Sequence, residues 1–371
     1  MYWPDIAQDN MDNTNKLHWM HLSDLHRGQD RTAEVWSVVR QEIHDDIKRQ
    51  IDSRGPVNLV IFSGDLAFKG DSEEFSSVKE ELKTLWEIFA KQGSKPSLFV
   101  VPGNHDLVRP RSTSPLRNMA DILRLKQDVR EEILSQTPSS YRDEAEIAFA
   151  NYKKFIKDLR ESGIPLALDQ EGMLPGDISA QINVNGLSVG LVGLNSAWTH
   201  LSGGEAIGKL DISVRQLNSV IDSDLPRWSR KNHVNFLVTH HPANWFSQAA
   251  QEEFEGEIFN PNYFDAHLFG HMHDNRPVLT SAGAHNRRTI QAASLFGLEK
   301  VNDKEERRHG YYFAILDANK ERCEYWPRKF EKKQGGIWQV SRDGEILSRD
   351  DSFYDEPWSI RKVEGLELKK I

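Results

Sequence analysis

The sequence predicts an α/β fold with mixed sheets, and two observations lead to this prediction. In the first third of the chain, short apolar runs alternate with amphipathic helical patterns. That alternation is typical of parallel strands joined by crossover helices. After about residue 178, strand-like runs follow one another through short connections such as Asn185-Gly186, which favour antiparallel neighbours.

The first third is expected to run strand, helix, strand, helix, strand. The three apolar, β-rich runs are Leu17–Leu22, Val57–Phe62 and Ser97–Val101. Each helix between them has an apolar stripe at helical spacing. The stripes consist of Val35, Val39, Ile43, Ile47 and Ile51, then Phe75, Val78, Leu82, Leu85 and Phe89. This order predicts a largely parallel sheet in this part of the chain.

The remaining chain divides by composition. Residues 109–163 are charged and contain no strand-like run, but show two helical patterns, Met119–Ile133 and Ala145–Leu159, so we expect a helical insertion or cap. Strand-like runs then resume at Ile178–Val184, Leu187–Leu194, Val234–Val238, Ala266–Phe269, Arg288–Ala293 and Tyr311–Leu316. The expected organisation is a flexible lead-in (1–15), one main domain (16–320) and a strand-containing C-terminal extension (321–371).

Composition limits the class of protein. The net charge of -9 argues against a protein that coats polyanions, although metal ions can supply local positive charge for a nucleic-acid substrate. A single cysteine, Cys323, excludes an intramolecular disulfide and a thiolate metal cluster. The first 16 residues lack the features of a signal peptide, and no apolar run approaches the roughly 18 residues of a membrane span. We therefore expect a cytoplasmic protein that does not associate with membranes.

Polar residues able to bind metal follow nearly every predicted strand. Because groups beyond the carboxyl ends of strands in an α/β sheet converge on one crevice, these side chains are expected to meet. Asp, Asn and His without Cys suit Mn²⁺, Fe, Zn²⁺ or similar ions, and two such ions can clamp a phosphoryl group. A bridging carboxylate is then needed, and Asp65 is central in the series. The residues are Asp24, His26, Asp65, Asn104, His105, His240, His271 and His273.

Five short blocks that contain these residues resemble the motifs of the calcineurin-like metallophosphoesterases and occur in that family's order. They are Ser23-Asp24-Leu25-His26, Ser63-Gly64-Asp65, Gly103-Asn104-His105-Asp106, Thr239-His240-His241-Pro242 and Gly270-His271-Met272-His273. The resemblance covers Leu17 to about Ala293. It implies a two-sheet mixed β-sandwich flanked by helices, with a dimetal site at one edge, a helical insertion and a C-terminal extension.

The resemblance also implies a role for each site residue. Asp24, His26 and His273 would bind one divalent ion, Asn104, His240 and His271 would bind the second, and Asp65 would bridge them. A hydroxide between the ions would attack phosphorus, with His105 as general acid and not as a ligand. Mn²⁺ is favoured, with Fe, Zn²⁺, Ni²⁺, Co²⁺ and Mg²⁺ as alternatives.

Two positions depart from the family's pattern. Many phosphodiesterases of the family have an acidic residue near Phe68, so the group that orients His105 is in question. Asp106 stands where the family's protein phosphatases typically have Glu, which disfavours a protein phosphatase. Arg109, Arg111 and Arg117 can either contact substrate phosphates or form a solvated basic face.

The predicted function is hydrolysis of a phosphodiester in a nucleotide or nucleic acid. One alternative is a DNA or RNA nuclease, and the other is a metal-bound scaffold or sensor subunit without turnover. The insertion (109–163) and the extension (321–371) are the candidate surfaces for a protein partner or for homo-oligomers. His241 is expected to support the ligands or to pack behind them, and His21 and His267 are expected to be core or edge histidines of the strands.

Overall fold

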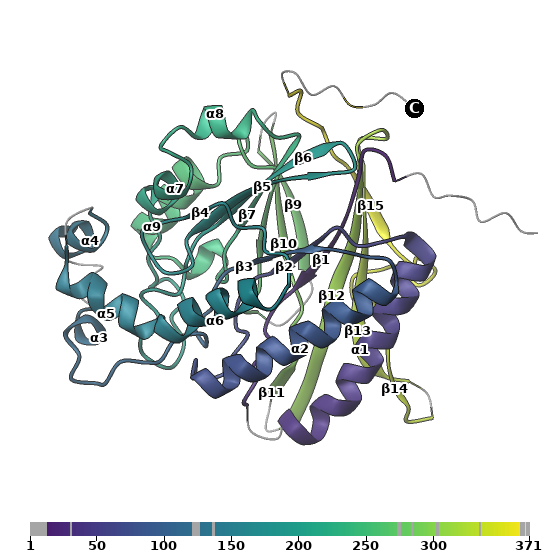
Figure 1. Cartoon of the computed structure of the whole chain (residues 1–371), viewed down its shortest axis with the longest axis horizontal. Coiled ribbons are helices and arrows are strands. Elements are labelled where there is room, and N and C mark those ends of the chain that lie inside the picture. The colour runs from purple at the N-terminus through teal and green to yellow at the C-terminus, as the bar shows by residue number, and fades with distance from the viewer. Residues whose placement is uncertain are drawn as a thin grey trace, which may run out of the picture.

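The computed structural model describes residues 13–29, 32–120, 127–135, 138–272, 276–282, 285–301, 304–333, 335–363 and 368. Residues 1–12 of the expected lead-in and the expected ligand His273 lie outside the described residues. The described part has two mixed β-sheets flanked by helices (Figure 1), so the predicted fold class is confirmed.

The first sheet contains the three strands predicted from the first third of the chain. β1 pairs with β2 and β2 with β3 in parallel, while β12 pairs with β1 in antiparallel. β11 (Gly297–Val301) also pairs with β12, and β15 (Tyr354–Pro357) with β13. Its central strands in spatial order are β14 (Trp338–Arg342), β13 (Arg322–Lys332), β12 (Lys304–Asp317), β1 (Lys16–Leu22), β2 (Leu59–Phe62) and β3 (Ser97–Val100).

The second sheet combines parallel and antiparallel pairs. β6, β7, β8 and β10 are mutually parallel neighbours, and antiparallel strands flank them on both sides. The turn at Asn185 and Gly186, both at positive φ, joins β5 to β6 as the expected hairpin. The spatial order is β4 (Gln170–Glu171), β5 (Ile178–Val184), β6 (Leu187–Gly193), β7 (Val234–Val238), β8 (Ala266–Phe269), β10 (His285–Gln291) and β9 (Arg276–Ala282).

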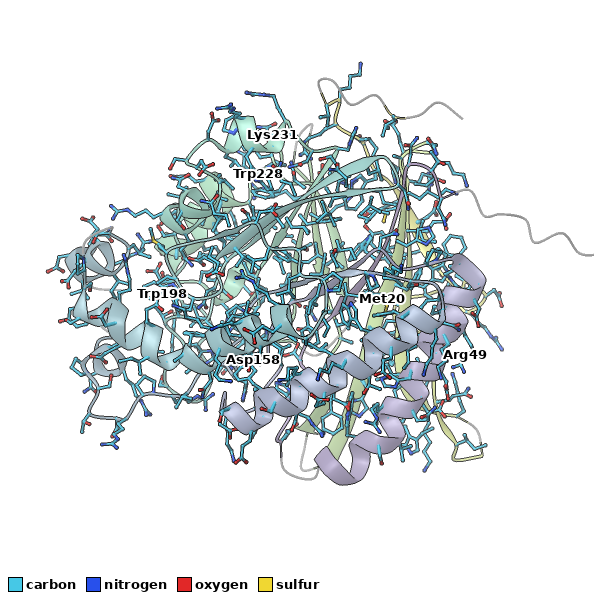
Figure 2. The ribbon with its side chains drawn as sticks, viewed as in Figure 1. Met20, Arg49, Asp158, Trp198, Trp228 and Lys231 are labelled. Atoms are coloured by element: carbon cyan, nitrogen blue, oxygen red, sulfur yellow. The ribbon has the colours of Figure 1, made fainter. Side chains whose placement is uncertain are left out.

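The strands bury alternate residues on opposite faces, as the period of a strand requires. In β1, Trp19 packs between the two sheets, whereas Met20 packs toward the helices. In β7, Phe236 lies between the sheets and Leu237 faces the helices on the far side. Met20 and Trp198 lie inside the molecule, while Arg49 and Lys231 lie at its periphery (Figure 2). The result is a sandwich with one apolar core between the sheets and one outside each sheet.

Helices cover both outer faces of the sandwich (Figure 1). On the first sheet lie α1 (Thr32–Arg54), α2 (Ser72–Lys91) and α6 (Ala150–Glu161). On the second lie α7 (Val214–Val220), α8 (Leu225–Ser229), η1 (Ala243–Trp245), α9 (Gln248–Glu253) and η2 (Phe254–Ile258).

The region expected to be a helical insertion contains more breaks than the sequence pattern indicated. Its described helices are α3 (Pro115–Ala120), α4 (Gln127–Ile133), α5 (Ser140–Ala148) and α6. The predicted single helix Ala145–Leu159 is wrong, because the chain turns at Phe149 between α5 and α6. Arg130 of α4 holds this region against the outer side of the second sheet by ion pairs to Asp211, in the loop before α7 (2.6 Å), and to Glu253 of α9 (2.7 Å).

The expected C-terminal extension contributes directly to the first sheet. β13 pairs with β12 over the register His309–Phe330 to Asp317–Arg322, and β14 and β15 both pair with β13. The position expected as the domain boundary lies in the turn between β12 and β13.

Candidate dimetal site

Five strand ends from the two sheets meet at one place. Asp24 and His26 follow β1, Asp65 follows β2, and Asn104 and His105 follow β3, all in the first sheet. His240 and His271 follow β7 and β8 in the second sheet. Hydrogen bonds cross between the sheets here, from His240 Nδ1 to the Ser63 carbonyl (2.8 Å) and from the His271 amide to Asp24 Oδ2 (3.0 Å). The parallel strand order therefore brings together side chains far apart in sequence.

Asp65 lies at the centre of the site. Its Oδ2 is 3.2 Å from His26 Nε2 and 3.2 Å from His240 Nε2. Its Oδ1 accepts a hydrogen bond of 2.7 Å from the His105 amide. One carboxylate oxygen thus lies between imidazoles of the two sheets, which is the position that a bridging ligand requires.

The two groups around Asp65 differ in composition. On one side, His26 Nε2 also lies 3.9 Å from Asp24 Oδ1. On the other, His240 Nε2 lies 3.1 Å from Asn104 Oδ1 and 3.1 Å from His271 Nδ1. The first group therefore offers mainly carboxylate oxygen and the second mainly imidazole nitrogen and amide oxygen.

The donor set fits metal ions, because lone pairs converge on two points. His240 donates its Nδ1 proton to the Ser63 carbonyl, and His26 donates its Nδ1 proton to the Phe296 carbonyl (3.4 Å). In the neutral ring the Nε2 lone pair of each histidine then faces Asp65. A main-chain carbonyl on the remote nitrogen is the usual way in which a ligating histidine is oriented.

The electrostatics of the site also favour a cation. Burial lowers the pKa of His240, but Asp65 and Asp24 outweigh it and raise this pKa to about 9. Burial raises the pKa of Asp65, but His240, His105 and His26 hold it well below its usual range. The field that favours a proton on His240 Nε2 favours a metal cation at the same place.

The backbone of the site is strained. Asp24, His26, Asp65 and His271 have φ values of 54°, 47°, 55° and 66°. This left-handed conformation is uncommon for residues other than glycine and costs about 1–3 kcal/mol each. Such strain is typical of functional sites, where the surrounding structure fixes a side chain in one direction.

Two motif glycines allow the loops to approach closely. A Cβ at position 103 would lie 2.1 Å from Asp65 Oδ1, and a Cβ at position 270 would lie 1.8 Å from Ser23 Oγ. Any side chain there would displace a site carboxylate or its neighbour. Gly103 and Gly270 are therefore required by space and not by turn formation alone.

His105 is oriented by Phe68, although Phe68 is apolar. The His105 ring donates its Nδ1 proton to the Phe68 carbonyl (2.7 Å) and stacks on the Phe68 ring with centroids 5.0 Å apart. Asp106 is not involved, because its oxygens accept from the Ala67 and Gly103 amides (2.8 and 2.9 Å). The proton that His105 can exchange is therefore on Nε2.

His241 belongs to a chain of hydrogen bonds behind the ligands. His200 donates Nε2–H to the Gly204 carbonyl (3.0 Å), so its Nδ1 accepts from His241 Nε2 (3.2 Å). His241 Nδ1 then accepts from Ser196 Oγ (3.0 Å), which itself accepts from the His240 and His241 amides. Both His241 ring nitrogens are thus engaged within the protein.

Among the described residues, side chains that could hold metal form three groups, each with ligand atoms within 4.8 Å of one another. They are Asp24 with Asp65 and His240, His26 with Asp65 and His105, and His240 with His241 and His271. The structure thus brings together Asp24, His26, Asp65, Asn104, His105, His240 and His271. His273 lies outside the described residues.

Two residues beside the site were not assigned to it from the sequence. Trp245 was missed, and Arg109 was left either to contact substrate phosphates or to form a solvated basic face. The Trp245 ring lies edge-on to the His271 ring, with centroids 4.0 Å apart. Arg109 is exposed and lies next to Gly203. Burial lowers the pKa of His105 and of His200, and the positive charge of Arg109 lowers both pKa values further. The signal that could have assigned both residues to the site is their position shortly after a motif block.

A profile of the calcineurin-like phosphoesterases matches residues 17–275. The chain belongs to the calcineurin-like phosphoesterase family. Membership implies a phosphoric ester hydrolase that works with two divalent metal ions, and the grouped His and Asp side chains are able to hold them. No curated protein matches the sequence.

Solved structures resemble this phosphoesterase only remotely. Purple acid phosphatase PPD1 of yellow lupin (Lupinus luteus) is 9% identical, with a TM-score of 0.47, over 85% of this chain and 52% of its own. SoxB, a sulfate thiohydrolase of Thermus thermophilus, is 13% identical, with a TM-score of 0.40, over 90% of this chain and 58% of its own. Vps29 of Chaetomium thermophilum is 8% identical, with a TM-score of 0.31, over 94% of this chain and 100% of its own. The phosphoesterase therefore spans about half the length of the first two.

Among the described residues of the phosphoesterase, no helix combines the length and apolar character that a membrane crossing needs.

Proposed function

We propose that this phosphoesterase hydrolyses a phosphodiester in a nucleotide or nucleic acid, with Mn²⁺ as the favoured metal. The observation that carries the proposal is the mixed border of the site, where one guanidinium occurs with exposed apolar side chains. A diester has one negative charge and two organic groups, so this border suits it better than it suits a monoester dianion.

Arg109 is the cation of that border. It is exposed, forms no ion pair with any described residue, and its charge reaches both His105 and His200. A single guanidinium with free donors can bind one non-bridging phosphate oxygen or two in a bidentate contact.

Three exposed apolar side chains stand on loops that carry site residues or lie beside Arg109, and we assign them to this border. Val108, Ile207 and Met272 are 44%, 45% and 38% exposed. Each belongs to a loop that also contributes to the site or contacts Arg109. They supply surface for a base or sugar on either side of the phosphate.

The side chains divide the work of the reaction. When bound, two divalent ions polarise the phosphoryl oxygens and make water more acidic. Asp24, His26 and His273 would hold one ion, Asn104, His240 and His271 the other, and Asp65 would bridge them. His105 Nε2 would transfer a proton to the leaving oxygen, while its Nδ1 stays bonded to the Phe68 carbonyl.

The test is hydrolysis of bis-p-nitrophenyl phosphate and p-nitrophenyl phosphate, each with Mn²⁺ and with chelator. The diester is expected to be cleaved at least about tenfold faster, and chelator should stop both reactions. Arg109→Gln should raise KM for the diester more than it lowers kcat. Arg111→Gln is the control, because Arg111 is the next exposed arginine of the same loop.

A panel of cyclic nucleotides, dinucleotides and single- and double-stranded nucleic acids then narrows the substrate. Preference for long nucleic acids would favour a nuclease. Faster cleavage of the monoester would contradict the proposal, and absence of turnover with every metal would favour the scaffold.

A further inference from the structure

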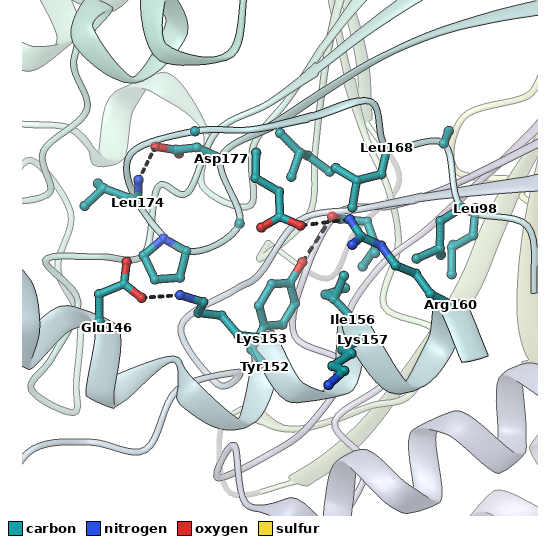
Figure 3. A pocket seen from close by; sticks show the side chains of 18 residues that line it. Leu98, Glu146, Tyr152, Lys153, Ile156, Lys157, Arg160, Leu168, Leu174 and Asp177 are labelled. Carbon is teal, nitrogen blue, oxygen red and sulfur yellow. Dashed lines mark hydrogen bonds and ion pairs between the residues drawn. The ribbon is translucent and has the colours of Figure 1, made fainter. Parts of the chain in front are cut away.

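A concave region lies beside the sandwich, between α6 and the adjacent edges of the two sheets (Figure 3). Its volume is about 270 Å³, near the lower end of the range of about 300–1,000 Å³ for small-molecule pockets. None of the site residues described above lines it. We call this region the α6 pocket and define it by Leu98, Tyr152, Ile156, Lys157, Leu168 and Asp177.

One part of the wall of the α6 pocket is apolar, and main-chain groups beside it are already hydrogen-bonded. Leu98, Ile156 and Leu168 provide aliphatic surface from a strand, a helix and a loop. The main chain beside them is paired, since the Leu98 amide donates to Pro165 and the Ala167 amide donates to Leu98. A ligand body that contacts these walls therefore needs no hydrogen bonds of its own.

The charged side chains that line the pocket are three cations and three acids: Lys153, Lys157 and Arg160, with Glu146, Glu171 and Asp177. Asp177 is buried and accepts from the Asn195 amide. Lys153 and Arg160 are each paired with an acid, at 2.5 Å to Glu146 and 2.8 Å to Glu171. Lys157 lies between these two residues on α6, lines the pocket and forms no ion pair with the described residues. One exposed cation is thus left to bind an anion beside an apolar interior.

Two walls of the pocket also support loops of the dimetal site. The Tyr152 hydroxyl donates to the Val100 carbonyl (3.1 Å), at the end of the strand that leads into Asn104. Asp177 accepts a hydrogen bond from the main-chain amide of Asn195 (2.8 Å). The next residue, Ser196, accepts a hydrogen bond at Oγ from the main-chain amide of His240. Residues that line the pocket are therefore linked by hydrogen bonds to the segments that position the Asn104 loop and the His240 loop.

We propose that the α6 pocket binds a small amphipathic anion, with its apolar body against Leu98, Ile156 and Leu168 and its charged head at Lys157. Because the walls support two ligand loops, occupancy changes the affinity of the dimetal site for metal. This second part rests on the assignment of Asn104 and His240 as ligands, whereas the first part does not.

Binding is tested on the full chain with 1-anilinonaphthalene-8-sulfonate, an aromatic body with one anionic group, followed by fluorescence. Saturable binding of the dye is expected. Octanoate and octyl phosphate should displace the dye at concentrations about tenfold lower than octanol. The two anions separate a carboxylate ligand from a phosphate ligand. Equal displacement by octanol would overturn the anionic head.

Three variants test the location. Lys157→Gln should weaken octanoate binding about fivefold to tenfold, whereas Lys154→Gln, on the same helix but paired with Asp158 at 2.8 Å, should leave it unchanged. Ile156→Trp should fill the pocket and abolish binding, with thermal unfolding as the check that it is folded. Full binding by folded Ile156→Trp would overturn the site.

Coupling is tested by titrating Mn²⁺ calorimetrically with and without octanoate. A change in Mn²⁺ affinity of about fivefold or more is expected, and by reciprocity Mn²⁺ must change octanoate affinity by the same factor. Unchanged Mn²⁺ affinity would overturn the coupling. Because neither measurement needs turnover, failure here is distinct from failure of the proposed phosphodiesterase.

Discussion

Buried histidines in two regions of this chain have opposite properties. In the dimetal site, His240 gives its Nδ1 proton to a carbonyl and directs Nε2 toward Asp65, and its pKa is about 9. Inside the strands, His21 and His267 direct Nε2 toward the hydroxyls of Ser63 and Thr239, at 2.9 and 2.8 Å. Burial lowers the pKa of each of these two to about 3.

The difference shows that burial alone does not give a histidine the surroundings that a metal ligand needs. All three rings are almost fully buried, and desolvation acts on each against the charged form. What distinguishes His240 is a carboxylate within 3.2 Å of Nε2. His267 bonds a neutral hydroxyl, and the Thr239 hydroxyl donates its own proton to the His241 carbonyl (2.7 Å), so His267 must donate.

Removing the carboxylate should have the largest effect. Asp65→Asn keeps Oδ1, which accepts from the His105 amide, but replaces the oxygen that faces both His26 and His240. Asn also tolerates the left-handed backbone at this position. We expect most metal to be lost and turnover to fall about 10³-fold or more, since each ion contributes several kcal/mol. Metal analysis after dialysis measures this, and retention of both ions would rule out a bridge at Asp65.

The second effect separates a proton donor from the ligands. His105→Ala should lower kcat by about 10²–10⁴-fold while metal content stays near that of the wild-type chain. Phe68→Leu is the control, because it keeps the carbonyl that binds His105 Nδ1 and removes only the ring stack. Its kcat should fall much less. If His105→Ala loses metal, His105 is a ligand and the assigned role is wrong.

A matched pair of substitutions compares the two regions directly. His240→Phe should weaken metal binding by about 100-fold or more, since even loss of a partner of a ligand costs 10–100-fold. His267→Phe should leave metal affinity unchanged, because Thr239 keeps its own bond to the His241 carbonyl. Isothermal titration with Mn²⁺ distinguishes them, and equal losses would show that the core histidine also serves the site.

The smallest effect concerns stability and pH. His267 has a pKa of about 3 in the folded chain and 6.5 as the ordinary value, so below pH 6.5 the unfolded state binds more protons. Its contribution to stability is complete above pH 6.5 and falls toward pH 3. His267→Phe should therefore reduce the slope of unfolding free energy against pH, between pH 3 and pH 6.5, by about 1.4 kcal/mol per pH unit. Denaturant unfolding at several pH values measures it, and an unchanged slope would contradict a neutral buried ring.

Much of the architecture could be predicted, because its signals are local. Alternate burial in β1, β2 and β3 and the helical stripes of α1 and α2 follow from side-chain periodicity. The turn at Phe149 was missed, because an apolar residue at helical spacing continues the pattern of both α5 and α6.

The grouping of the seven described residues at the candidate site could be predicted, but the main-chain groups that orient their side chains could not. Asp65 and His240 were expected together because both follow parallel strands. The carbonyls of Ser63, Phe68 and Phe296, which set the proton positions of three histidines, could not be found, because every residue has a carbonyl. The acidic residue that many family phosphodiesterases have near Phe68 is absent here, and the Phe68 carbonyl orients His105. A main-chain group of this kind leaves no trace in side-chain identity.

The left-handed residues Asp24, His26, Asp65 and His271 have a consequence for laboratory evolution. Glycine or asparagine relieves the conformational penalty of such positions, so variants there should resist heat better than the parent while losing metal. A library screened for heat resistance alone is therefore expected to enrich inactive clones at these four codons. Sequencing the survivors, with and without a parallel screen for phosphodiester cleavage, measures how far substitutions that raise heat resistance lower activity in this chain.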